Sequence, residues 1–222
     1  MKAFVVFAFA SVALSAPRKC DIRAVDQCLG RALPFANNSM FQDFEQKCMK
    51  GREGVNCLVD YAKAECLKGD ALNALKLLLS GTASECALTC QPGTDNYDAY
   101  FKYMGCSNKY GELIHKCMRK ATAYIEAAAI SGGSFRGSLT CCAFDCLSTC
   151  LGEAAEKQCP EQIGAKDYFQ GVVKSVSGKF IAAQCGAYQL GAPECKKLPE
   201  LTIGEPKYTT IYGPLLEFLS LQ

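Results

Sequence analysis

Sixteen cysteines constrain the fold of this chain more than any other feature of the sequence. They are Cys20, Cys28, Cys48, Cys57, Cys66, Cys86, Cys90, Cys106, Cys117, Cys141, Cys142, Cys146, Cys150, Cys159, Cys185 and Cys195. An even and large number of cysteines is typical of secreted proteins that fold in an oxidising compartment. We therefore predict about eight disulfides, whose pairing the sequence does not determine.

Metal binding is the competing interpretation of so many cysteines. Zinc sites use closely spaced cysteine pairs or sets of cysteine and histidine. The chain has no Cys-x-x-Cys pair and a single histidine, His115. We therefore predict no metal site and no cofactor.

The N-terminus has the order of segments found in signal peptides. Lys2 precedes an apolar run from Ala3 to Leu14, and the small residues Ser15 and Ala16 follow. This run is too short to cross a bilayer, which takes about 20 residues. We expect residues 1–16 to be removed and the mature protein to be secreted, with no membrane span.

The charge balance argues against a polyanionic partner. Loss of Lys2 with the leader would leave 23 basic residues from the original 24, against 22 acidic ones. Nucleic-acid binding usually requires clustered basic residues, whereas both signs of charge are mixed along this chain. We expect no nucleic-acid partner.

The segments between turn signals favour helices, because Ala, Leu, Lys, Glu and Gln dominate them. Ser39 and Gln42 have the spacing of a capping box before a helix that runs to about Lys50. Asp70 is a candidate cap for a helix over 71–80 that Gly81 would end. Further helices are expected over 108–130 and 138–158, with loops at 91–93 and 131–134. The predicted fold class is all-α, a bundle of helices joined by disulfides.

The cysteine spacing predicts two related helical modules. The series Cys20, Cys28, Cys48, Cys57, Cys66, Cys86 and Cys90 aligns with Cys106, Cys117, Cys142, Cys150, Cys159, Cys185 and Cys195, and leaves Cys141 and Cys146 as extras. Chance alignment of so many cysteines is the alternative. The expected organisation is a signal peptide (1–16), a first module (17–92), a second module (93–197) and a cysteine-free tail (198–222).

Helix geometry limits how these cysteines pair. Residues nine apart on a helix point in opposite directions, so Cys57 and Cys66 should join one helix to two neighbours. Cys86 and Cys90 lie on one stripe, where pairing within the stripe is unfavourable. Because each series has seven members, at least one disulfide is expected to join the two modules.

No catalytic constellation emerges. The run Cys141-Cys142-Ala143-Phe144-Asp145-Cys146 resembles the paired-cysteine helix of secreted phospholipases A2, in which a histidine precedes a calcium-binding aspartate. Phe144 stands where that general base would be, so hydrolysis by this route is not expected. His115 and Cys117 are two residues apart on a helix and face different ways. Carboxylate pairs such as Asp95 with Asp98, and Glu153 with Glu156, are ordinary on helix faces. The chain is not expected to be an enzyme.

Asn37-Asn38-Ser39 is a sequence for N-glycosylation, which makes Asn37 a glycosylation candidate in a secreted protein. Helices with cysteines about nine residues apart, as at Cys48, Cys57 and Cys66, resemble the secreted cysteine-rich helical domains of arthropods and nematodes. The 27 kDa haemolymph glycoproteins of insects are similar in style. The resemblance implies an extracellular, non-catalytic protein and no particular binding residues.

Three functions stay open. The first is a stable structural or interaction protein of an extracellular fluid or secretion, with a protein partner or self-association. The second is a carrier of a lipid or other apolar small molecule, since 12 Phe and 10 Tyr could line a pocket. The third is a venom or salivary effector.

Overall fold

The computed structural model describes residues 20–32, 44–109 and 111–221. Within these ranges the chain forms helices and no strands, which confirms the predicted all-α class. The expected leader and Asn37 lie outside the described residues. None of the helices in these ranges combines the length and the apolar content that crossing a bilayer requires.

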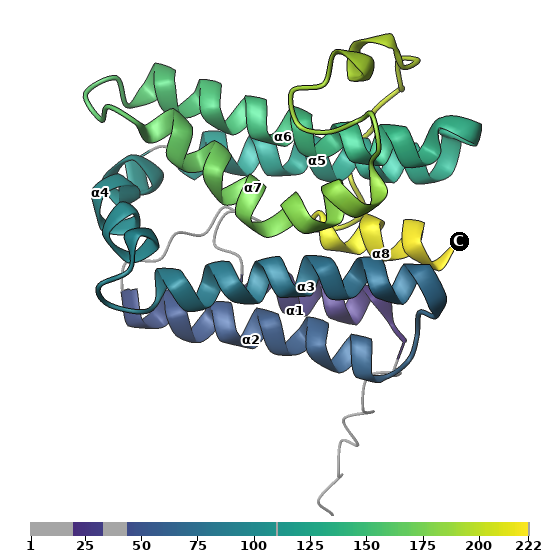
Figure 1. Ribbon diagram of the computed structural model, residues 1–222, viewed down its shortest axis with the longest axis horizontal. Coiled ribbons are helices and arrows are strands. Elements are labelled where there is room, and N and C mark those ends of the chain that lie inside the picture. Colours follow the sequence, from purple (N-terminus) through teal and green to yellow (C-terminus); the bar gives the residue numbers. More distant parts are fainter. Residues whose placement is uncertain (1–19, 33–43, 110, 222) are drawn as a thin grey trace, which may run out of the picture.

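Eight α-helices and two short 3₁₀ helices make up the described part of the chain. Their bounds are α1 Ile22–Ala32, α2 Phe44–Lys63, α3 Gly69–Thr89, α4 Asp95–Lys109, α5 Gly111–Ser131, η1 Gly133–Phe135, α6 Arg136–Gln158, α7 Ala165–Gln184, η2 Pro193–Lys197 and α8 Tyr212–Ser220. Figure 1 shows α1, α2 and α3 as one layer and α5, α6 and α7 as a second, with α4 at one end. Helix α8 lies between the layers at the opposite end.

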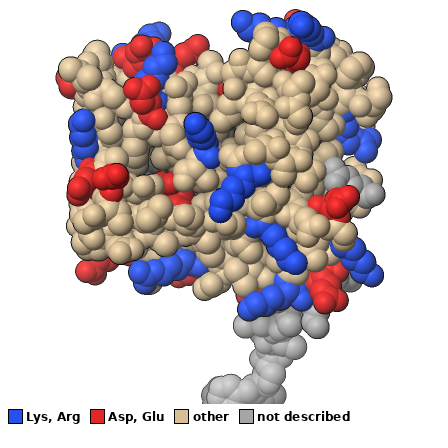
Figure 2. Space-filling model, viewed as in Figure 1, with Lys and Arg blue, Asp and Glu red and all other residues tan. Residues whose placement is uncertain are grey.

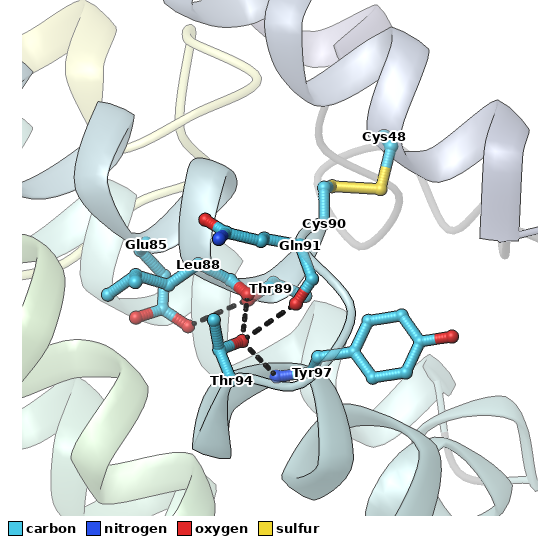
Figure 3. The surroundings of a disulfide bond; sticks show 8 residues. All are labelled: Cys48, Glu85, Leu88, Thr89, Cys90, Gln91, Thr94 and Tyr97. Atoms are coloured by element: carbon cyan, nitrogen blue, oxygen red, sulfur yellow. Dashed lines mark hydrogen bonds between the residues drawn. A yellow bond between two sulfur atoms is a disulfide. The ribbon is translucent and has the colours of Figure 1, made fainter.

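Polar side chains fix several helix starts. The carboxylate of Asp21 accepts hydrogen bonds from the backbone amides of Arg23 and Ala24, at 2.9 and 3.2 Å. The hydroxyl of Thr94 accepts one from the amide of Tyr97 at 3.1 Å and donates to the carbonyls of Leu88 and Gln91 (Figure 3). Thr94 thus caps α4 and closes the turn that follows α3.

Helix α3 differs from its prediction. Asp70 lies in its first turn, while Lys68 occupies the cap position without a side-chain hydrogen bond. The helix continues through Gly81, the residue expected to end it, as far as Thr89. Gly81 is instead the point where another backbone comes close, because a Cβ built there would lie 2.1 Å from the carbonyl oxygen of Val176. The predicted loop at 91–93 separates α3 from α4. Of the loop predicted at 131–134, Ser131 ends α5 and Gly133 and Ser134 belong to η1, which lies between α5 and α6.

Seven disulfides cross-link the helices, each within one of the two predicted modules. The pairs are Cys20–Cys66, Cys28–Cys57, Cys48–Cys90, Cys106–Cys159, Cys117–Cys150, Cys141–Cys185 and Cys142–Cys195. The expectation that a disulfide joins the modules is therefore wrong. It assumed that every cysteine pairs, whereas Cys86 and Cys146 are free.

Because Cys86 and Cys146 are free, the structure has seven disulfides and not the eight or so that were expected. Helical neighbours of both residues are already paired. Cys90, one turn after Cys86, is bonded to Cys48. Cys142 and Cys150, one turn on either side of Cys146, are bonded to Cys195 and Cys117. As predicted, no pair forms within a stripe.

Disulfide pairing also corrects the alignment of the two modules. Cys90 directly follows α3 and is bonded to Cys48. Cys185 directly follows α7 and is bonded to Cys141. Cys48 and Cys141 also lie equally far ahead of Cys57 and Cys150. The matching pairs are thus Cys20–Cys66 with Cys106–Cys159, Cys28–Cys57 with Cys117–Cys150, and Cys48–Cys90 with Cys141–Cys185. The pair Cys142–Cys195 is then the extra one.

The cross-links of Cys57 and Cys66 do not reach two different helices. Cys57 is bonded to Cys28 in α1, and Cys66 to Cys20 just ahead of α1. Helix α2 ends at Lys63, so Cys66 lies beyond the helix that the prediction placed it on. In the second module Cys150 joins α6 to α5, and Cys159 joins the end of α6 to α4.

The modules pack through α3 and α7, which contact each other and cross at an angle (Figure 1). Gly81 and Val176 meet at this contact and lie equally far ahead of Cys90 and Cys185. Residues at matching positions meet in this way at an interface between two copies related by a two-fold axis. The contact of Gly81 with Val176 is one such meeting of matching positions.

The C-terminal segment completes the core. Tyr212, Leu215, Leu216, Phe218 and Leu219 of α8 are buried against α1, α3 and α5. The carboxylate of Asp26, buried in α1, accepts hydrogen bonds from the amides of Thr209 and Thr210 at 2.7 and 2.9 Å. The tail thus joins both modules from within.

Candidate functional site

A cavity of about 290 Å³ lies between the two modules. Both modules contribute to its wall, the second through α4 as well as through α5, α6 and α7, and α8 completes it. Its lining is Leu29, Ala32, Lys47, Gly51, Gly54, Val55, Thr82, Glu85, Cys86, Thr89, Cys90, Tyr100, Met104, Asn108, Ile114, Met118, Phe144, Leu147, Leu151, Tyr168, Phe169, Val172, Val173, Val176, Ser177, Ile211 and Tyr212. An interface between domains is a common place for a small-molecule site.

The wall from the second module is almost entirely apolar. Phe144, Leu147 and Leu151 follow one face of α6, and Phe169 and Val173 follow one face of α7. All five side chains are buried, so their positions are fixed by packing against the rest of the core. This part of the cavity suits a hydrocarbon surface.

Two glycines of α2 let this helix come close to α1 and α3 in the cavity wall. Gly51 and Gly54 both line the cavity. A Cβ at Gly51 would lie 2.9 Å from the sulfur of Cys86, and one at Gly54 would lie 2.7 Å from the Cβ of Ala32. Larger residues at either position would push α2 away from α1 and α3.

The charged groups of the cavity are at its α2–α3–α4 end. Lys47 is the single Lys or Arg of the lining and Glu85 is its single carboxylate. The Lys47 ammonium lies 4.0 Å from the centre of the Tyr100 ring, a cation–π contact. Burial lowers the pKa of Lys47 to about 8, although Cys86 and Glu85 act in the opposite direction.

Glu85 is held by neighbours other than Lys47. Its two carboxylate oxygens accept hydrogen bonds from the hydroxyl of Thr89 at 3.2 Å and from the side-chain amide of Asn96 at 2.9 Å. Figure 3 shows Glu85 beside Thr89, one turn ahead of the Cys48–Cys90 disulfide. Glu85 therefore joins the end of α3 to the start of α4 through these two hydrogen bonds.

Cys86 places a free thiol on the cavity wall. The side chain is partly buried, and burial raises the pKa of its thiol, while Lys47 and Arg52 oppose that increase. The thiol is therefore protonated at neutral pH. Cys146, the other free cysteine, is exposed on α6 and does not line the cavity.

A hydrogen bond fastens α3 to α8 elsewhere in the lining. The hydroxyl oxygens of Thr82 and Tyr212 are 2.6 Å apart, and Tyr212 is buried. Burial raises the pKa of Tyr212, so it stays neutral at physiological pH. This pair satisfies two hydroxyl groups in an otherwise apolar surrounding.

The residues considered for catalysis are distributed over α4, α5 and α6. Asp145 accepts a hydrogen bond from the amide of Gly191 at 2.6 Å, which fastens the loop after α7 onto α6. Asp95 and Asp98 are in the first turn of α4. Glu156 pairs with Lys166 at 2.8 Å on the surface. Among the described residues no group of three or more His, Cys, Asp or Glu side chains is placed to hold a metal ion.

Charges of both signs are dispersed over the visible face of the molecule (Figure 2). Lys and Arg side chains cross its centre, and acidic side chains occur around its margins. Broad areas of uncharged residues separate them.

The sequence did not identify the residues of this cavity. Lys47, Glu85 and Cys86 come from helices whose pairing is set by disulfides, and no local pattern connects them. Lys47 directly precedes Cys48 and Glu85 lies five residues ahead of Cys90, so the Cys48–Cys90 disulfide brings the two charged residues to one end of the cavity, and this pairing could not be read from the sequence.

Comparisons of the chain with protein-family models, with curated proteins and with solved structures found no match. The resemblance to secreted cysteine-rich helical domains thus stays a prediction.

Proposed function

We propose that this protein is a secreted, non-catalytic carrier that binds a small apolar molecule in the cavity between its two modules. The observation that carries the proposal is the cavity itself, with a volume of about 290 Å³ and an apolar wall. This volume is close to the lower end of small-molecule sites, which begins at roughly 300 Å³. Of the three functions that the sequence leaves open, the carrier is the one that uses this feature.

The distribution of polar groups supports binding of a molecule other than water alone. A dry cavity of roughly 150 Å³ lined by aliphatic and aromatic side chains binds benzene. The cavity described here is about twice as large, and its two charged side chains are at one end. Its opposite wall offers water few hydrogen bonds.

Secretion is supported by the disulfides and by the apolar leader. Seven cross-links are expected to resist unfolding and proteolysis in an extracellular fluid. They also keep the helices of each module in place around an internal space, which a less constrained bundle would tend to fill by collapse.

Displacement of a fluorescent apolar probe tests the proposal. 1-Naphthylamine, a small aromatic fluorophore, should bind the native mature protein with one site and shift its emission to shorter wavelength. Native mass spectrometry of protein from its natural secretion should show an adduct that denaturation removes.

Two matched variants locate the binding. Val55→Phe should fill part of the cavity and weaken probe binding at least tenfold, because Val55 belongs to the lining. Val59→Phe changes a partly buried residue one turn along α2 that is outside the lining, and should leave the affinity unchanged. Equal effects of the two substitutions, or no binding by the wild type, would refute the carrier proposal.

A further inference from the structure

We propose that the ligand is a monocarboxylate with a hydrocarbon chain of about ten carbons, its carboxylate bound by Lys47 and its chain lying along the wall formed by α6 and α7. This inference rests on the proposed carrier function and specifies the chemical class of the ligand. It follows from the position, the contacts and the number of charged groups in the cavity.

The Lys47 ammonium has hydrogen-bonding capacity to spare. Three donors are available on this group. Its contact within the described residues is the face of the Tyr100 ring, which accepts no conventional hydrogen bond. Partial burial without an acceptor is unfavourable for an ammonium, and desolvation lowers the pKa of Lys47. A ligand carboxylate would supply the missing acceptor and countercharge.

Glu85 does not take this role. It forms no ion pair with Lys47, and both of its oxygens are occupied by Thr89 and Asn96. The carboxylate is thereby directed to the start of α4. Lys47 and Glu85 therefore do not neutralise each other through an ion pair. Of the two, Lys47 is the one that lines the cavity without a hydrogen-bond partner among the described residues.

The size of the cavity sets the length of the chain. By comparison with the roughly 150 Å³ that hold the six carbons of benzene, about 290 Å³ hold on the order of a dozen non-hydrogen atoms. Decanoate has that number. Phe144, Leu147 and Val173 provide the surface along which its methylene groups would lie.

A series of ligands with one chain and three head groups tests the inference. Decanoate, decan-1-ol and decylamine are each used at pH 7 to displace 1-naphthylamine from the wild type, Lys47→Arg and Lys47→Met. Decanoate should bind the wild type about tenfold or more tightly than decan-1-ol, as expected for a hydrogen-bonded charge pair. Decylamine should bind most weakly.

The variants separate charge from shape. Lys47→Met should weaken decanoate about tenfold and leave decan-1-ol unchanged, while Lys47→Arg should retain the preference for decanoate. Circular dichroism shows whether each variant is folded. If Lys47→Met does not fold, the preference of Lys47→Arg for decanoate over decan-1-ol still decides the test.

Failure of this inference is distinguishable from failure of the carrier function. Equal affinity for decanoate and decan-1-ol, or tightest binding of decylamine, would overturn the assignment of Lys47 while the cavity still binds. Absence of binding by all three ligands and by the probe would overturn both proposals.

Discussion

The buried carboxylate of Asp26 accepts two hydrogen bonds from Thr210, one from its backbone amide at 2.9 Å and one from its hydroxyl at 2.7 Å. The first residue lies in α1 and the second directly precedes the last helix of the chain. Thr210 also accepts a hydrogen bond from the amide of Tyr212 at 3.2 Å. This small network positions α8 before its apolar side chains enter the core.

Asp26→Ala should lower the free energy of unfolding by about 2 to 4 kcal/mol, because the buried donors of Thr209 and Thr210 would lose their acceptor. Urea denaturation followed by circular dichroism measures the change. Asp60→Ala, at an exposed position of α2, is the control and should change stability by less than about 0.5 kcal/mol. Similar losses in the two variants would contradict the role of Asp26.

Gly81→Ala should destabilise the protein by at least about 2 kcal/mol, because the new methyl group would meet the backbone of Val176 and force α3 from α7. Gly171→Ala, on the exposed side of α7 with no atom within 4 Å of the added Cβ, should instead stabilise by about 0.5 to 1 kcal/mol through helix propensity. Thermal unfolding of both variants measures the contrast. A Gly81→Ala variant as stable as the wild type would disprove the close contact.

Alkylation without reduction, in denaturant, should label two thiols and no more. Peptide mapping should place the labels on Cys86 and Cys146. In the native protein N-ethylmaleimide should react faster with exposed Cys146, and saturating decanoate should slow the reaction of Cys86 alone, since only Cys86 lines the cavity. Protection of both thiols, or of neither, would argue against a ligand beside α3.

Lys47 should make stability depend on pH between about 8 and 10.5. Its folded pKa, about 8, is below the ordinary value of 10.5, so in this window the unfolded chain binds more protons at Lys47 than the folded chain does. Stability contributed by this residue therefore rises with pH, by about 1 to 3 kcal/mol.

The comparison of wild type with Lys47→Met isolates that contribution. Glu85, Cys86 and Tyr100, which surround the ammonium, are common to both proteins. Urea denaturation at pH 7 and pH 10 should show the wild type gaining stability relative to Lys47→Met, whereas Lys63→Met at the exposed end of α2 should follow the wild type. A constant difference between wild type and Lys47→Met would be inconsistent with a desolvated ammonium.

Glycine and proline breaks and helix-favouring composition predicted several of the helices correctly. The Pro92-Gly93 turn and the Gly132-Gly133 break separate helices as expected, and the helix predicted over 138–158 is α6. Gly81 was misjudged because a glycine that ends a helix and one that admits a neighbouring backbone have the same local sequence. Only the presence of α7 distinguishes them.

Pairing of the cysteines could be predicted only in part. Spacing indicated two related series, but it matched Cys48 with Cys142, whereas the bonded partners match it with Cys141. Adjacent cysteines differ by about 100° around a helix, and their partners depend on which helices lie on either side. The cavity depends on the same tertiary arrangement, so nothing in the sequence indicates that Lys47 and Cys86 line one site.

All fourteen bonded cysteines have their partners in their own half of the molecule, so the contact of α3 with α7 is held by side-chain packing and by α8 rather than by sulfur. The disulfides therefore constrain each half internally and place no covalent limit on the distance between the halves. A guest molecule could enter and leave through this seam without any covalent bond being broken, and the rate of exchange would be set by how often the halves separate.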